Sequence, residues 1–160
     1  MTCVWKGLIE SLRLKKMKPA NLLLKLQNEN KATPDMLYNG KPLTTQNYAE
    51  NISRIKELTA KNIKMGYDCG GCDPLLLLVG QVYCVSIEHM HEGIVLRYTN
   101  IKSDKLIKVE SDSGHFWSVT QLSESPGKKK REEKPIKNNN VTVNESASNG
   151  KKKKKTKINN

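Results

Sequence analysis

The segment that decides the fold is Asp73-Pro74-Leu75-Leu76-Leu77-Leu78-Val79, near the middle of the 160-residue chain. Aspartate followed by proline predicts a helix start, because aspartate caps helices and proline is favoured at their first position. The apolar run continues to about Tyr83 and leaves no polar face. A helix that is apolar all round is buried, so we expect this one inside the domain.

Working outward from this helix, the hydrophobic pattern predicts helices before it and strands after it. Apolar residues at helical spacing predict three earlier helices, over 3–14, 19–30 and 44–61. Alternation of apolar and polar residues predicts four later strands, near 84–89, 94–98, 106–109 and 116–119. Grouped helices followed by strands indicate an α+β domain, with N-terminal helices packed on a small mixed or antiparallel sheet.

A turn-rich segment separates the second and third predicted helices. Its Asn39-Gly40 pair favours a tight turn with positive backbone angles. Pro42 follows closely and argues against a regular two-residue hairpin, because proline cannot donate a sheet hydrogen bond.

Charge divides the chain into two parts. Residues 1–124 carry a net charge of +3, and residues 125–160 carry +9 of the total of +12. The second part has no aromatic residue and almost nothing apolar, so burial cannot offset the entropy of ordering it. We therefore expect one domain over 1–124 and a disordered Lys/Asn-rich tail over 125–160. Lysine runs in this tail are typical of nuclear-import signals or of weak, nonspecific binding to nucleic acid.

Four cysteines lie at positions 3, 69, 72 and 84, with no signal peptide before them and no apolar run long enough to span a bilayer. We expect a soluble, monomeric intracellular protein with reduced thiols, in the cytoplasm or the nucleus. Cys69 and Cys72 have zinc-knuckle spacing, which Cys84, His89 and His91 would complete. Because the intervening helix and strand would have to fold back at once, we expect ordinary thiols, a histidine pair on one face of a strand end, and no metal.

Cys3 and His115 are the candidate catalytic pair. A thiol attacks a carbonyl as thiolate, and a nearby imidazole is the usual group that deprotonates it. Cys3 opens a predicted helix, where the positive end stabilises a thiolate, and His115 follows Gly114 at the start of an aromatic strand.

The chain resembles the ovarian tumour (OTU) cysteine proteases, through three stretches that together cover most of residues 3–119. They are Cys3-Val4-Trp5 at a helix start, the segment from Gly66 through the leucine run to Ile87, and Gly93 to Tyr98 followed by Gly114-His115-Phe116. The short format and the Asn/Lys-rich tail look like the viral members. This resemblance implies a papain-like fold and a deubiquitinase that cleaves ubiquitin or ubiquitin-like conjugates without a cofactor, with Cys3 as nucleophile and His115 as base.

Two departures from the family pattern affect the site. Only Met1 and Thr2 precede Cys3, where the family has an Asp-Gly-rich oxyanion loop. Trp117 stands two residues after His115, where the family often has an Asp or Asn that orients the imidazole. Asp112 can replace that group only if the chain turns at Ser113-Gly114, because three residues along a strand reverse the face.

Trp5 and Trp117 are candidate walls of a substrate channel, with packing as the alternative. The missing loop favours a second hypothesis, a catalytically inactive ubiquitin-binding module. A third, from another class, is a basic accessory protein that binds nucleic acid through its tail.

Overall fold

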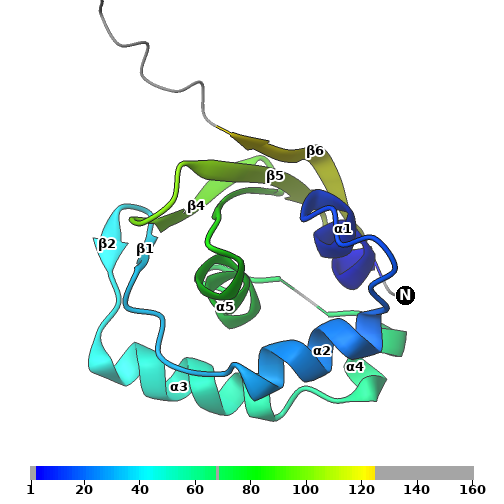
Figure 1. Cartoon of the computed structure of the whole chain (residues 1–160), viewed down its shortest axis with the longest axis horizontal. Coiled ribbons are helices and arrows are strands. Elements are labelled where there is room, and N and C mark those ends of the chain that lie inside the picture. Colours follow the sequence, from blue (N-terminus) through cyan, green and yellow to red (C-terminus); the bar gives the residue numbers. More distant parts are fainter. Residues whose placement is uncertain (1–2, 68, 125–160) are drawn as a thin grey trace, which may run out of the picture. The chain divides into compact units, whose positions relative to one another are not determined.

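The computed structural model describes residues 3–67 and 69–124, and the predicted tail lies outside them. The described residues form a mixed α+β fold, as the pattern predicted, but with five helices and six strands rather than four of each (Figure 1). The helices are α1 (Cys3–Ser11), α2 (Pro19–Asn28), α3 (Thr45–Lys56), α4 (Ala60–Met65) and α5 (Pro74–Tyr83). The strands are β1 (Met36–Tyr38), β2 (Lys41–Pro42), β3 (Ser86–His91), β4 (Ile94–Asn100), β5 (Lys105–Ser111) and β6 (Phe116–Glu124).

The strands form one mixed sheet in the order β2-β1-β4-β3-β5-β6. Strands β3 and β4 form an antiparallel hairpin, and the chain then crosses to the other side of β3, where β5 runs parallel to it. Strand β6 returns antiparallel to β5 at the edge of the sheet. The residues that join β5 to β6 therefore lie near one end of the sheet, beside the β3–β4 turn.

Helix α5 is the centre of the core, as the leucine run predicted. Its residues Pro74 to Gly80 are all buried. Figure 1 shows it between the sheet and the helices α2 and α3. Each fully buried leucine contributes on the order of 1.5–3 kcal/mol of hydrophobic free energy, so this helix supplies a large share of the core's stability.

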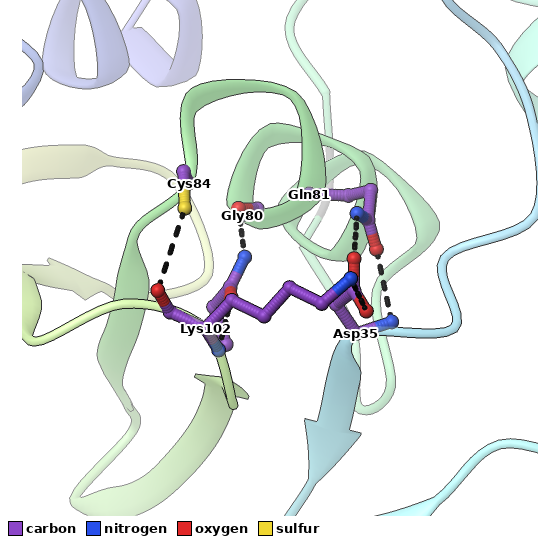
Figure 2. A network of polar contacts seen from close by, with 6 residues as sticks. Asp35, Gly80, Gln81, Cys84 and Lys102 are labelled. Carbon is purple, nitrogen blue, oxygen red and sulfur yellow. Dashed lines mark hydrogen bonds and ion pairs between the residues drawn. The ribbon is translucent and has the colours of Figure 1, made fainter.

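The C-terminal half of α5 is tied to the sheet by the polar network of Figure 2. The Asp35 backbone N–H donates to Gln81 Oε1 at 3.1 Å, and Gln81 Nε2 donates to Asp35 Oδ2 at 2.8 Å. Lys102 Nζ lies 2.8 Å from the other Asp35 oxygen, and these two donors lower the pKa of the Asp35 carboxyl. Asn100 Nδ2 donates to the Gly80 carbonyl at 2.9 Å, which holds the same helix against β4.

The structure overturns the expectation about Pro42. Tyr38 pairs with Lys41, so Asn39 and Gly40 form a two-residue hairpin loop, with φ angles of 48° and 78°. Pro42 fits because β2 is an edge strand, where a missing N–H removes no interior sheet bond.

The predicted third helix is two helices. Helix α3 ends at Lys56, and Thr59 begins α4 with a capping box to Asn62. The Thr59 backbone N–H donates to Asn62 Oδ1 at 2.8 Å, and Thr59 Oγ1 accepts from Lys61 N–H at 3.2 Å. This reciprocal cap satisfies amides that a continuous helix would bond internally, so the chain turns here. The first helix is likewise shorter than predicted and ends at Ser11.

Asp73 predicts a pH dependence of stability. Its Oδ1 accepts from the N–H groups of Leu75 and Leu76, and burial raises the pKa of its carboxyl from 3.8 to about 6. The folded state binds this proton more tightly than the unfolded state, so the contribution is present below pH 3.8 and is lost as pH rises through 6.

We therefore expect Asp73→Asn, which keeps the cap and stays neutral, to gain stability relative to wild type between pH 4 and pH 7, by about 2–3 kcal/mol. Urea unfolding at both pH values measures this difference. Equal differences at the two pH values would contradict a buried, titrating carboxyl.

Candidate active site

Cys3 and His115 line the same cavity, which has a volume of about 520 Å³. Three segments form its walls: the start of α1, the residues that follow α4, and the connection between β5 and β6. The lining residues are Cys3, Val4, Met65, Gly66, Tyr67, Cys69, Ser111, Asp112, Ser113, Gly114, His115 and Phe116. The structure thus brings together residues more than a hundred positions apart in the chain.

Cys3 is the first residue of α1 and is half-buried. Backbone N–H groups in a first helical turn have no partner within the helix and give this end a partial positive charge. Gly7 lies one turn further along the same face, and a Cβ there would lie 2.8 Å from Phe116 Cδ1. This face of α1 therefore lies against the start of β6, and Cys3 lines the same cavity as the residues that precede Phe116.

His115 is held by a tight turn at the end of β5. The Asp112 backbone N–H donates to the His115 carbonyl at 3.0 Å. Asp112 Oδ1 accepts from the N–H groups of Gly114 and His115, at 2.9 and 2.8 Å. These two donors lower the pKa of the Asp112 carboxyl. The turn at Ser113-Gly114 that the sequence analysis required is present.

This turn sets Asp112 beside the imidazole. Asp112 Oδ1 lies 3.6 Å from His115 Nδ1, which is an ion-pair distance and longer than a hydrogen bond. Both side chains are more than half exposed. Asp112 Oδ1 thus lies beside the imidazole while it accepts hydrogen bonds from two backbone amides.

Neither tryptophan lines the cavity. Trp5 is fully buried, and its ring meets the edge of Tyr67 with centroids 6.5 Å apart. A substrate cannot reach Trp5, so its expected role as a channel wall is replaced by core packing. Trp117 points to the opposite sheet face from Phe116, because neighbouring strand residues alternate, and its Nε1 donates to Glu110 Oε2 at 3.2 Å.

Two residues of the cavity wall, Met65 and Tyr67, were given no role from the sequence. Tyr67 and Met65 lie on one side of the cavity, and Met65 is 71% exposed. The Tyr67 hydroxyl donates to Asp73 Oδ1 at 3.2 Å, so the cap of α5 also holds this wall. Burial raises the pKa of Tyr67, which keeps its hydroxyl protonated as the donor. Gly66-Tyr67 belongs to the stretch that carries the family resemblance, but its spacing alone indicates no contact with Cys3.

His89 and His91 contact Ser111, which lines the cavity. Ser111 Oγ is 2.7 Å from His89 Nε2 and 2.8 Å from His91 Nδ1. The Ser111 hydroxyl has one proton, so at least one of these two ring nitrogens donates to the serine oxygen. Burial, with a smaller effect of His91, lowers the pKa of His89 from 6.5 to about 4. The two histidines share one face at the strand end, as predicted.

The cysteines do not assemble the four-ligand site that the spacing allowed. Cys72 precedes α5 and Cys84 follows it, so a helix of about 15 Å separates them. Within residues 3–67 and 69–124, no group of three or more His, Cys, Asp or Glu is placed to hold a metal ion. In the same ranges no helix is long and apolar enough to cross a membrane.

Comparison of the chain with protein-family models, curated proteins and solved structures finds no match in any of the three. The site itself contains a thiol at the start of α1, an imidazole on the turn before β6, and a carboxylate beside that imidazole.

His89 predicts a second pH dependence, opposite in sign to that of Asp73. A histidine in the unfolded chain is protonated below about pH 6.5. In the folded protein His89 is protonated only below about pH 4. Stability is thus lost as pH falls through this window. We expect His89→Gln to reduce the loss between pH 7 and pH 5, measured by urea unfolding. His91→Gln, on the same strand but partly exposed, is the matched control. An unchanged pH slope in His89→Gln would contradict the assignment.

Proposed function

We propose that this protein is an OTU-like cysteine peptidase that hydrolyses ubiquitin or ubiquitin-like conjugates. The observation that supports it best is the shared cavity of Cys3 and His115, one at a helix start and the other on the turn before β6. The reaction class follows from these two groups. The substrate class rests on the sequence resemblance, since a fold does not determine a substrate.

The chemistry begins with proton transfer from the Cys3 thiol to the His115 imidazole. The thiolate attacks the carbonyl carbon of the scissile amide, and the carbonyl oxygen becomes an oxyanion. His115 then returns the proton to the leaving amine as the C–N bond breaks, which leaves a thioester on Cys3. Water attacks this thioester with His115 as base, and the carboxylate product leaves with the thiol restored.

The start of α1 supplies the charge stabilisation in this proposal. The N–H groups of its first turn have no partners within the helix, and no acidic residue lies in that turn. Donors fixed in place before the reaction stabilise a developing oxyanion without reorganisation.

Asp112 acts through His115 and is a positioning residue in this proposal. Its carboxylate lies 3.6 Å from Nδ1 and stabilises the imidazolium that forms during attack. We expect Asp112→Ala, which also removes the two backbone bonds of the turn, to lower kcat more than KM, about 10- to 100-fold. Asp112→Asn keeps the turn acceptor without the charge, so it separates the two effects. Unchanged kcat in both variants would contradict this role.

Labelling with a ubiquitin probe that carries a C-terminal electrophile tests the function directly. We expect wild type to form a covalent adduct and Cys3→Ala to form none while keeping its thermal unfolding temperature. Cys69→Ala, Cys72→Ala and Cys84→Ala are matched controls and should label. Adduct formation by Cys3→Ala with loss in one control would identify another nucleophile.

The inactive ubiquitin-binding module is the second candidate, and one observation favours it. The distance from Asp112 to His115 exceeds a hydrogen bond, so the imidazole has a weaker orienting partner than the catalytic triads of known peptidases. Binding of ubiquitin by wild type, measured by calorimetry, without any adduct or hydrolysis would select this candidate over the peptidase.

A further inference from the structure

Phe116 connects the two halves of the candidate site. It follows His115 directly in the chain, and its ring is 4% exposed. The ring lies against Gly7 of α1, the helix that begins with Cys3. The contact between these two residues is therefore where the thiol-bearing element meets the imidazole-bearing element.

The approach at Gly7 is closer than any side chain would allow. A Cβ at Gly7 would lie 2.8 Å from Phe116 Cδ1 and 3.0 Å from Cε1. Carbon atoms in favourable contact stay about 3.5–4.0 Å apart. Any residue larger than glycine would thus push α1 away from β6, or move the ring.

The ring has little freedom to move away from α1. Its centroid lies 5.7 Å from that of His89, a fully buried side chain. His89 is bonded to the Ser111 hydroxyl, which is also bonded to His91. Ser111 pairs with Phe116 across the antiparallel β5–β6 ladder. The buried histidine, which the peptidase mechanism does not use, is thus a second fixed neighbour of the ring.

We propose that Gly7 and Phe116 are positioning residues whose contact, supported by His89, sets the separation between Cys3 and His115. This inference rests on the pairing of Cys3 with His115 in the proposed function, but not on the substrate. Displacing α1 moves Cys3 relative to His115 because Cys3 and Gly7 share one helix face.

The test is the pH dependence of Cys3 alkylation by iodoacetamide, followed by peptide mass spectrometry in the full chain. A thiol paired with an imidazole reacts well below the pH at which an ordinary thiol does. The pH profile of wild type represents a Cys3 thiol that is paired with an imidazole. The profile of His115→Ala represents an unpaired thiol. This readout needs no ubiquitin, and a purely structural role for Gly7 would not move it.

We expect Gly7→Ala to lower the alkylation rate near pH 6 about 10- to 100-fold, toward the profile of His115→Ala. Adding Phe116→Val, which lacks the clashing ring carbons, should restore most of the rate. Phe116→Leu serves the same purpose if the valine variant unfolds. Gly80→Ala is the matched control, because its Cβ would also meet core atoms, Met36 Cε and Val85 O, but on α5 rather than α1.

Three results would overturn the inference: Gly7→Ala with the wild-type profile, Gly7→Ala altered no more than Gly80→Ala, or failure of both Phe116 substitutions to restore the rate. A wild-type profile identical to that of His115→Ala would reject both the pairing and the inference. The expected alkylation profiles together with no adduct on the ubiquitin probe would reject the proposed substrate class and support the positioning role.

Discussion

Burial of Pro74 to Gly80, the first seven residues of α5, is the constraint on which the rest of the structure depends. Its leucines leave no polar face, so the fold must cover the helix on every side. The sheet covers it on one side and α2 and α3 on the other (Figure 1). The cost is a buried carboxylate at its start, since Asp73 caps the helix from a position that is 1% exposed. That carboxylate is tolerated because it accepts bonds from two helix amides and from Tyr67.

This arrangement determines where a site can form. Helix α5 lies against β4, β3 and β1, so the remaining inner surface of the sheet, at β5 and β6, is covered by α1. The helix at the start of the described chain thereby meets its last strand. The cavity lies at this junction, and its third wall is the segment between α4 and the cap of α5. The same helix that organises the core therefore holds Tyr67 in the wall through Asp73.

The buried polar groups near the site are stabilised by pairing. Desolvation is the main cause of the altered pKa values of both Asp73 and His89, and it acts in opposite directions because one group is an acid and the other a base. One polar atom of each side chain is hydrogen-bonded, which offsets part of the cost of burial. His89 connects to Ser111, and Asp73 to Tyr67, so each buried group also supports a wall of the cavity.

The sequence by itself determined the features that depend on neighbouring residues. The cap and leucine run of α5, and the four strands that follow it, could be predicted from local patterns, whereas the short strands β1 and β2 between α2 and α3 could not. Side-chain chemistry led to the proposal of Cys3 and His115 as a reactive pair. Local patterns failed to predict two features of the secondary structure, one set by a side-chain cap and the other by the position of a strand in the sheet. The Thr59–Asn62 cap divided one predicted helix into two, and the edge position of β2 accommodated Pro42.

Only the tertiary structure decided which distant residues meet. It brought Cys3 and His115 to one cavity, placed Met65 and Tyr67 in its wall, and buried Trp5. These outcomes depend on contacts between segments far apart in the chain, whose geometry is set by packing around α5 and by the close approach at Gly7. Hydrophobic periodicity identifies the face of an element that is buried, but it carries no information about the partner that covers it.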